Sequence, residues 1–298
     1  MEMEENELSI NRVDNNNREP IVGEYYLKIQ DQTDRYGHPK LDDESKSQLQ
    51  KDSKKIFKRL KFSGDTGLVV GKIQSGKTMS FQAITGLSRD NKVPIFIILA
   101  GVTDILVKQT VDRFKKDFSD PNLNLDIRQT TLDESYAQKL SNDIEPWLDP
   151  ESPEIFRKTN IIVAMKQKQH LSNLANLLSN VRGLDDVRVL IVDDEADQYG
   201  LNVGESEDDP SAIFNGIKIL REEVKQHSYL QYTATPAANL LVAFENILNP
   251  NFALNINPGP QYTELSDLFR TDSPYIETIG DDEELGENGE EEGGDELK

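Results

Sequence analysis

Short apolar runs alternate along the chain with longer stretches in which apolar residues return every three or four positions. The short runs predict buried strands near 67–70, 94–99, 160–165, 188–193 and 228–233. The longer stretches predict helices near 44–60, 77–88, 104–118, 134–147, 168–180, 211–226 and 237–246. Strands and helices that alternate in this way indicate an α/β fold with a mostly parallel sheet and helices on both faces.

The composition fits one large domain with appendages. The chain has 298 residues, of which 36% are hydrophobic and 29% are charged, and it has no cysteine. Disulfides and thiolate zinc sites are therefore excluded, and the three histidines, His38, His170 and His227, show no metal-ligand spacing. The longest apolar stretch, around 95–102, is too short to span a membrane, and the acidic N-terminus is unlike a signal peptide. We expect a cytoplasmic protein with no membrane partner.

Negative charge is concentrated at the two ends of the chain. The formal net charge is −21; residues 281–298 hold ten acidic residues and one lysine, and residues 1–9 hold four acidic residues. Such segments have little to bury, so we expect an acidic flexible arm at 1–20 and an acidic disordered tail at 277–298. Between them we expect a helical extension at 21–62 and the main domain at 63–276. The tail is interpreted as solvated, with docking on a basic partner or mimicry of nucleic acid as the alternative.

A phosphate-binding loop lies between a predicted strand and a predicted helix. Residues 71–78 have the pattern G-x-x-x-x-G-K-T, and the candidate phosphate ligands are Gly71, Gln74, Ser75, Gly76, Lys77 and Thr78. The glycines let backbone N–H groups surround an anion, and the helix N-terminus adds its positive dipole. Lys77 would reach the β- and γ-phosphates, and the hydroxyl of Thr78 would bind Mg²⁺.

An acidic cluster follows the predicted strand at 188–193, in the pattern D-D-E-A-D. Carboxylates at the carboxyl end of a parallel strand point into the crevice where α/β proteins bind ligands. We expect Asp194 to hold Mg²⁺, through water, and Glu195 to orient or deprotonate the attacking water. A helix N-cap is the alternative for Asp193 or Asp197, but it does not explain why the cluster accompanies a phosphate loop. A third element, Thr233-Ala234-Thr235-Pro236, follows the next strand-like run.

Together, GKIQSGKT, DDEAD and TATP resemble the first RecA-like lobe of superfamily two helicases, the DEAD-box relatives. The runs FIILAGVT and YTATPAANLL are similar to the helicase part of bacterial proteins described as endonucleases that carry a Z-one domain, over about residues 62–262. The resemblance implies a P-loop NTPase (RecA-like) domain at 63–276. It also implies that Asp197, Thr233 and Thr235 couple the nucleotide state to nucleic acid, and that Gly101 and Thr103 lie near a nucleic-acid strand.

Lys166, after the predicted strand at 160–165, is a candidate phosphate contact, with a plain solvated lysine as the favoured alternative. The lysine-rich stretch at 51–61 predicts a solvated helix face rather than a DNA contact.

Relatives of this kind use a second lobe that supplies arginines to the ATP site, and we expect that lobe and the Z-one domain to be missing here. The sequence thus predicts an ATP- and Mg²⁺-binding lobe of a helicase-like, nucleic-acid-dependent ATPase that converts ATP and water to ADP and phosphate. We expect DNA rather than RNA as the nucleic acid, a second-lobe or nuclease partner, and slow turnover by the chain alone. The alternative is a non-catalytic nucleotide switch or remnant that completes a partner. A P-loop kinase is a weaker alternative, which the DEAD and TAT motifs disfavour.

Overall fold

The computed structural model describes residues 19–34, 36–72, 76–129, 134–199, 210–236, 239 and 248–257. All of them belong to a compact unit that spans residues 1–260. The predicted helix at 237–246 and the predicted acidic arm and tail lie outside the described residues, apart from Asn239 and the last residues of the arm. Among the described helices, none has the length and apolar composition needed to cross a bilayer.

The described residues form a seven-stranded sheet with the strand order β3-β4-β2-β5-β6-β1-β7, in which every recorded pairing is parallel. The strands are β1 (Asp65–Val70), β2 (Ile95–Ala100), β3 (Leu125–Gln129), β4 (Thr159–Ala164), β5 (Val189–Asp194), β6 (His227–Thr233) and β7 (Phe252–Asn255). The predicted α/β class and its five predicted strands are confirmed. The edge strands β3 and β7 were not predicted.

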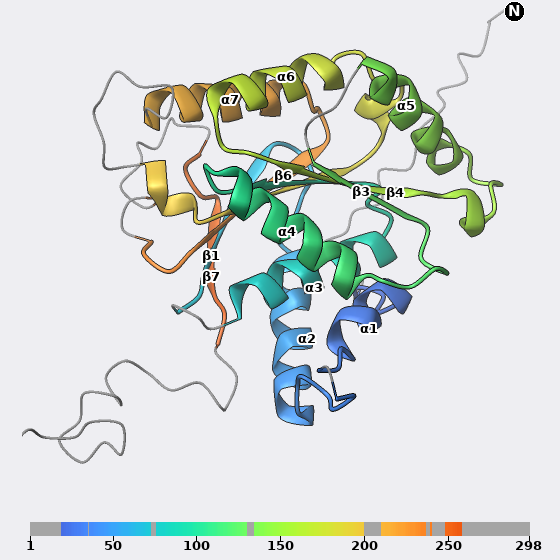
Figure 1. The fold of residues 1–298 in the computed structure, drawn as a ribbon, viewed down its shortest axis with the longest axis vertical. Coiled ribbons are helices and arrows are strands. Elements are labelled where there is room, and N and C mark those ends of the chain that lie inside the picture. The colour runs from blue at the N-terminus through green and yellow to red at the C-terminus, as the bar shows by residue number, and fades with distance from the viewer. Residues whose placement is uncertain are drawn as a thin grey trace, which may run out of the picture. The chain divides into compact units, whose positions relative to one another are not determined.

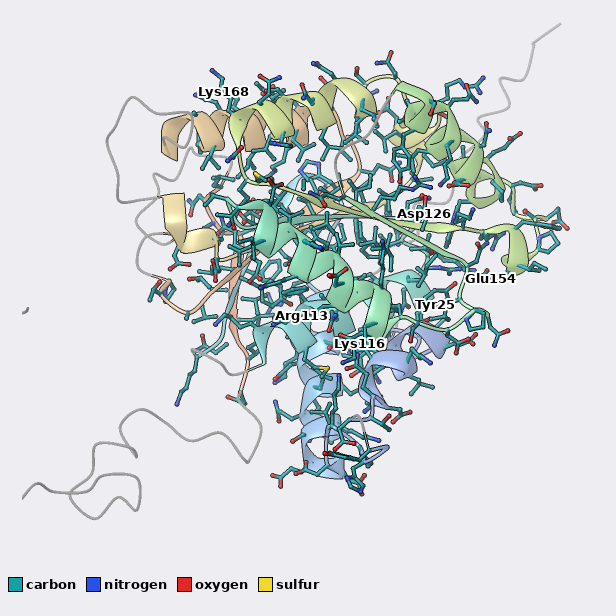
Figure 2. The ribbon with its side chains drawn as sticks, viewed as in Figure 1. Tyr25, Arg113, Lys116, Asp126, Glu154 and Lys168 are labelled. Atoms are coloured by element: carbon teal, nitrogen blue, oxygen red, sulfur yellow. The ribbon has the colours of Figure 1, made fainter. Side chains whose placement is uncertain are left out.

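Helices cover both faces of the sheet (Figure 1). One layer contains α1 (Glu24–Gln30), α2 (Asp43–Phe57), α3 (Lys77–Asp90) and α4 (Asp104–Asp117), and the other contains α5 (Glu134–Leu148), α6 (Lys168–Leu178) and α7 (Pro210–Glu222). Figure 2 shows the two layers through their side chains, with Lys168 of α6 on one side of the sheet and Arg113 and Lys116 of α4 on the other. Six of these helices were predicted within a few residues, whereas α1 was not predicted as a separate helix.

Side chains of alternate residues in the central strands pack into two separate hydrophobic cores, one on each face of the sheet. Leu190 and Val192 of β5 pack in the core below α3 and α4, whereas Val189 and Ile191 pack in the core below α5, α6 and α7. Successive strand residues point to opposite faces, which explains this division. Because both faces are covered, β2, β4 and most of β5 are buried along their length. Each contains a continuous apolar run of at least four residues rather than an alternating pattern.

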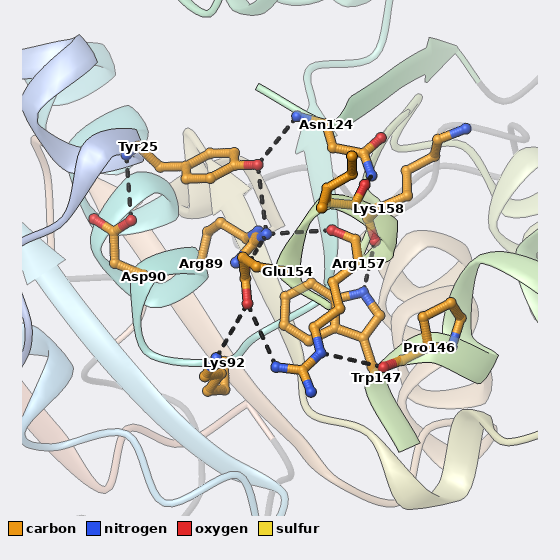
Figure 3. Close-up of polar contacts among 11 residues, drawn as sticks. Tyr25, Arg89, Asp90, Lys92, Asn124, Pro146, Trp147, Glu154, Arg157 and Lys158 are labelled. Carbon is orange, nitrogen blue, oxygen red and sulfur yellow. Dashed lines mark hydrogen bonds and ion pairs between the residues drawn. The ribbon is translucent and has the colours of Figure 1, made fainter. Parts of the chain in front are cut away.

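The N-terminal segment is fastened to the end of α3. The carboxylate of Asp90 accepts hydrogen bonds from the backbone N–H groups of Gly23, Tyr25 and Tyr26 at 2.9–3.2 Å. The buried guanidinium of Arg89 lies 4.4 Å from the ring centres of both Tyr25 and Trp147 (Figure 3).

Glu154 holds the same guanidinium of Arg89 in an ion pair at 2.7 Å. Asp90 and the Arg89 cluster therefore tie α1 and the α5–β4 connection to the helix that begins at the phosphate loop.

Candidate functional site

The phosphate loop begins where β1 ends and closes onto β6. The N–H of Gly71 donates to the carbonyl of Thr233 at 3.0 Å, and a Cβ added at Gly71 would lie 2.9 Å from side-chain atoms of Ile256 and Lys77. Gly76 has φ +86°, which favours glycine, and no described atom lies within 4 Å of a Cβ built there. Helix α3 starts at the next residue, Lys77. Gln74 and Ser75 lie outside the described residues.

Two protein groups hold the side chains that were expected to bind phosphate and Mg²⁺. The Nζ of Lys77 donates to the carbonyl oxygen of Lys72 at 3.1 Å. The Oγ1 of Thr78 accepts from Nη1 of Arg113 at 3.1 Å, so a cation reaches this hydroxyl from α4. Sequence reasoning missed Arg113, because nothing in the spacing of α4 relates it to a residue 35 positions earlier.

The acidic cluster separates into residues with different surroundings. Asp193 is fully buried, Asp194 is partly buried, and Glu195 is exposed with φ +55°. A left-handed conformation costs about 1 kcal/mol in a residue other than glycine, so the surroundings must hold Glu195 in it. Burial raises the pKa of Asp194, although the charge of Lys166 opposes that effect. The short helix η4 (Ala196–Tyr199) follows the turn.

Asp193 is part of a buried network rather than a helix cap. One carboxylate oxygen accepts a hydrogen bond from the hydroxyl of Tyr229, and the other lies 3.2 Å from Nζ of Lys166. The N-cap interpretation of Asp193 is therefore not supported, because these partners are side chains and not the N–H groups at the start of a helix.

Lys166 is fully buried, so its interpretation as a solvated lysine is wrong. Its ammonium also donates to the carbonyl oxygens of Asp194 and, at 3.1 Å, of Glu195. Because these contacts hold the ammonium inside the protein, the buried side chain does not reach a nucleic-acid phosphate at the surface in this conformation. A sequence signal did exist, since Lys166 continues the alternation of Ile162 and Ala164, which places it on the side of the sheet that Asp193 faces.

The motif after β6 contacts the acidic cluster directly. The hydroxyl of Thr235 donates to the carboxylate of Asp197, and the N–H of Thr235 donates to Oγ1 of Thr233 at 2.9 Å. The side chain of Asn239 donates to the carbonyl of Ala196 at 3.1 Å. The three residues predicted to couple nucleotide and nucleic acid are thus joined in one hydrogen-bonded chain, and their coupling role stays a prediction.

The loop after β2 adjoins the same edge of the sheet. Gly101 has φ +62°, and a Cβ there would lie 2.5 Å from Leu106, so this turn requires glycine. Thr103 caps α4, with its Oγ1 accepting from the N–H of Leu106 at 3.4 Å. The carbonyl of Gly101 accepts from the N–H of Lys166 at 2.8 Å, which links this loop to the acidic cluster.

The donor set fits Mg²⁺ bound together with a nucleotide. No group of three potential metal-ligating side chains occurs in the part of the chain that the structure describes, and such a cage is not required. Mg²⁺ in nucleotide sites is held by one or two carboxylates, a hydroxyl and the phosphates themselves, with several waters retained. Asp194 and Thr78 offer the carboxylate and the hydroxyl, and no described atom lies within 4 Å of a Cβ built at the neighbouring Gly76.

The strand order brings these parts together. β5, β6 and β1 are neighbours, with Asp194 opposite Tyr232 and Val70 opposite Thr233, so the motifs that follow these strands share the carboxyl edge of the sheet. A glycine loop between a strand and a helix, with an acidic turn two strands away, defines the class of P-loop nucleoside triphosphatases with a RecA-like sheet.

A model of the DEAD/DEAH box helicase family matches residues 50–242. This is more than half of the chain, and the chain belongs to that family. A search of curated proteins finds no match.

Several solved structures are similar at low identity. The helicase domain of Hef from Pyrococcus furiosus is 21% identical, with a TM-score of 0.40, over 65% of this chain and 35% of that one. DEAD-box helicase Mss116 bound to ssRNA and UDP-BeF is 18% identical, with a TM-score of 0.45, over 70% and 39%. DUF1998 helicase MrfA bound to DNA and AMPPNP is 14% identical, with a TM-score of 0.45, over 78% and 29%. The chain thus spans 29% to 39% of the length of these structures, and the family assignment rests on the family model alone.

Proposed function

We propose that the chain is the ATP- and Mg²⁺-binding lobe of a nucleic-acid-dependent ATPase of helicase type. The observation that carries this proposal is the adjacency of β5, β6 and β1, which places the acidic turn, the Thr233–Thr235 segment and the phosphate loop at one edge of the sheet. The match to the DEAD/DEAH box family supports the same reaction class, the attack of water on a γ-phosphate.

The residues have separate tasks in this reaction. Lys77 would exchange the neutral carbonyl of Lys72 for the charged phosphates, a stronger partner for an ammonium. Thr78 and Asp194 would hold Mg²⁺, which neutralises charge on the phosphates. Glu195, exposed beside Asp194, would orient the attacking water and accept its proton. Gln74, Ser75 and Gly76 would surround the phosphates with backbone N–H groups.

The finer proposals concern what completes this lobe. We propose that a second lobe, or a nuclease partner, supplies an arginine to the γ-phosphate, because such an arginine raises hydrolysis by roughly 10³–10⁵-fold. DNA is the proposed nucleic acid, in a DNA-processing or endonuclease system, and the loop at Gly101 and Thr103 is its proposed contact. This part of the proposal rests on the motif resemblance to proteins that carry a Z-one domain.

A second candidate is a nucleotide switch that regulates a partner without turnover. The contact between Arg113 and Thr78 favours it, because Mg²⁺ at Thr78 would repel the guanidinium and change how α4 contacts α3. Binding alone would then alter the surface of the lobe, even if hydrolysis is very slow.

Steady-state ATP hydrolysis by the purified chain tests the two candidates. It is measured without nucleic acid, with single-stranded DNA and with single-stranded RNA, beside nucleotide binding followed with a fluorescent ATP analogue. Lys77→Ala should weaken binding, whereas Glu195→Gln should keep binding and lose hydrolysis. Stimulation by DNA that both variants lack supports the ATPase, and binding without hydrolysis supports the switch. A chain that binds no nucleotide in the presence of Mg²⁺ would refute both.

A further inference from the structure

Lys166 crosses the carboxyl edge of the sheet inside the protein. It follows β4, yet its ammonium reaches the end of β5, and β2 lies between these two strands. Strands two places apart are separated by about 10 Å, so the side chain must extend across the end of β2 to make these contacts. The backbone of Lys166 is held there too, since its N–H donates to Gly101 at 2.8 Å.

Three acceptors at the end of β5 surround the ammonium. They are the carboxylate of Asp193, at 3.2 Å, and the carbonyl oxygens of Asp194 and Glu195. An ammonium has three N–H donors, which these three acceptors can satisfy. The two carbonyls belong to the peptides on either side of the Glu195 N–Cα–C unit, the unit with φ +55°. Lys166 therefore forms hydrogen bonds with the backbone on both sides of Glu195, the residue in the left-handed conformation.

The buried ion pair between Lys166 and Asp193 has a high desolvation cost, and apolar side chains could fill the same space. An ion pair between two fully buried groups pays a large desolvation penalty, and apolar residues of similar volume are often at least as stabilising. Asp193 has no exposed surface and belongs to the opposite face of β5 from Asp194, so it takes no part in the proposed chemistry. We explain its presence by its ion pair with Lys166, which holds the ammonium in place. The hydroxyl of Tyr229, on β6, donates a hydrogen bond to the Asp193 carboxylate and holds it in turn.

We propose that Lys166 is a positioning residue of the ATPase site, which holds the left-handed turn at Glu195 and joins that turn to the loop at Gly101–Thr103. The inference rests on the proposed function, because Glu195 must act on water for its position to matter. Lys166 touches neither nucleotide nor water in this account. It fixes the backbone from which the Glu195 carboxylate projects, and it links that backbone to the loop proposed to contact DNA. The next residue, Gln167, contacts the same loop, since its Nε2 donates to the carbonyl oxygen of Val102 at 3.2 Å.

The test uses the full chain and three variants. Lys166→Met removes the donor but leaves Asp193 as an unpaired buried charge, which can prevent folding. Lys166→Met combined with Asp193→Asn removes both charges and keeps an acceptor for Tyr229. Arg89→Met is the matched control, since it also removes a buried, paired cation, but from the cluster at the far end of α3. Each protein is assayed for nucleotide affinity, for kcat with and without single-stranded DNA, and for backbone hydrogen exchange.

The double variant should bind nucleotide as the parent does, within about twofold, because the phosphate loop is unchanged. Its kcat should fall about 100-fold, the loss expected when a catalytic group is misplaced by about 1 Å, and stimulation by DNA should disappear. Amides of residues 194–197 should exchange faster. Arg89→Met should lower the denaturation midpoint without changing kcat per folded molecule. A parent-like kcat in the double variant overturns the inference, as does a loss of nucleotide affinity in parallel with kcat, which would indicate a merely structural role.

The hydrogen-exchange measurement separates this inference from the proposed function. If the parent chain hydrolyses no ATP under any condition, the ATPase proposal fails, and exchange alone decides the role of Lys166. Faster exchange at 194–197 and at 101–103 in the double variant, with both segments unchanged in Arg89→Met, would sustain the link between the two segments. Unchanged exchange at these segments would overturn it.

Discussion

His227 leads to a quantitative prediction about acid stability, because its ring must be neutral in the folded protein. The side chain is 5% exposed, Nε2 accepts from Nε of Arg221 at 3.0 Å, and Nδ1 lies 2.5 Å from the carbonyl oxygen of Val224. Arginine can only donate, so Nε2 carries no proton and the N–H at Nδ1 donates to Val224. A proton added at Nε2 would break the bond to Arg221 and leave two cations together in a buried site.

Burial is the main cause that lowers the pKa of His227 from 6.5 to about 4; the hydrogen bond to Val224 and the charge of Asp65 oppose this shift, and the charge of Arg221 adds to it. The unfolded chain keeps the ordinary pKa, so between these two values the unfolded state binds the additional proton. The stability contributed by the neutral ring is therefore complete above about pH 6.5, falls progressively as the pH decreases from 6.5 to 4, and is fully lost below about 4. One pKa unit corresponds to about 1.4 kcal/mol, which gives a loss of about 3 kcal/mol over the full window. About 2 kcal/mol of it falls between about pH 7.5 and pH 5.

Urea denaturation at these two pH values measures the effect. The chain has one tryptophan, Trp147, and its ring lies 4.4 Å from the guanidinium of Arg89, so its fluorescence should report unfolding. His227→Gln is the reference, because an amide can accept from Arg221 and donate to Val224 without titrating. The parent should lose about 2 kcal/mol more than the variant on acidification. Equal losses in the two proteins would show that the ring titrates normally and would refute the argument.

Three further predictions concern packing and the phosphate loop. Gly67→Ala should lower the free energy of unfolding by about 1–3 kcal/mol in urea denaturation, because the added Cβ would lie 2.2 Å from Cζ of Phe252. Adding Phe252→Leu should restore part of the loss. An unchanged free energy of unfolding in Gly67→Ala would contradict the close approach. Arg89→Met should cost about 2–4 kcal/mol by the same assay, through lost ring contacts and hydrogen bonds, and a change below about 0.5 kcal/mol would contradict a structural role. Arg113→Gln should lower the Mg²⁺ concentration needed for half-maximal nucleotide binding about fivefold, since a unit charge about 4 Å away in water is worth about 1 kcal/mol. If the Mg²⁺ concentration required is unchanged, the charge of Arg113 does not oppose the binding of Mg²⁺ at Thr78.

The sheet could be predicted where burial alone decides the sequence. β2, with the sequence IFIILA, and β4, with the sequence TNIIVA, are buried along their whole length, and apart from the first two residues of β4 they are apolar. The edge strand β3 has the sequence LDIRQ, and none of its residues is fully buried. Its Asp126 forms ion pairs with Arg128 in the same strand and with Lys139 of α5, so its charges are neutralised by partners that an apolar pattern does not reveal. β7, with FALN at the other edge, is too short and too mixed to stand out.

The site could be predicted where a motif carries its own context. The phosphate loop has a strand before it and a helix after it, so its fold follows from local sequence. The contact between Arg113 and Thr78 depends instead on how α4 lies against α3, which no local pattern specifies. The burial of Lys166 likewise depends on the strand order, which brings β4, β2 and β5 side by side.

The doubled acid shows where strand periodicity could have taken the sequence argument further. Asp193 continues the alternation of Val189 and Ile191, whose side chains pack below α6 and α7, whereas Asp194 continues that of Leu190 and Val192, on the side of α3. Since α3 begins at the phosphate loop, only Asp194 lies on the face from which a carboxylate can reach Mg²⁺. Asp193 is left as an acid inside an apolar core, and an acid there requires a buried cation. The period of two therefore separates two adjacent, chemically identical residues into a candidate metal ligand and a buried structural partner.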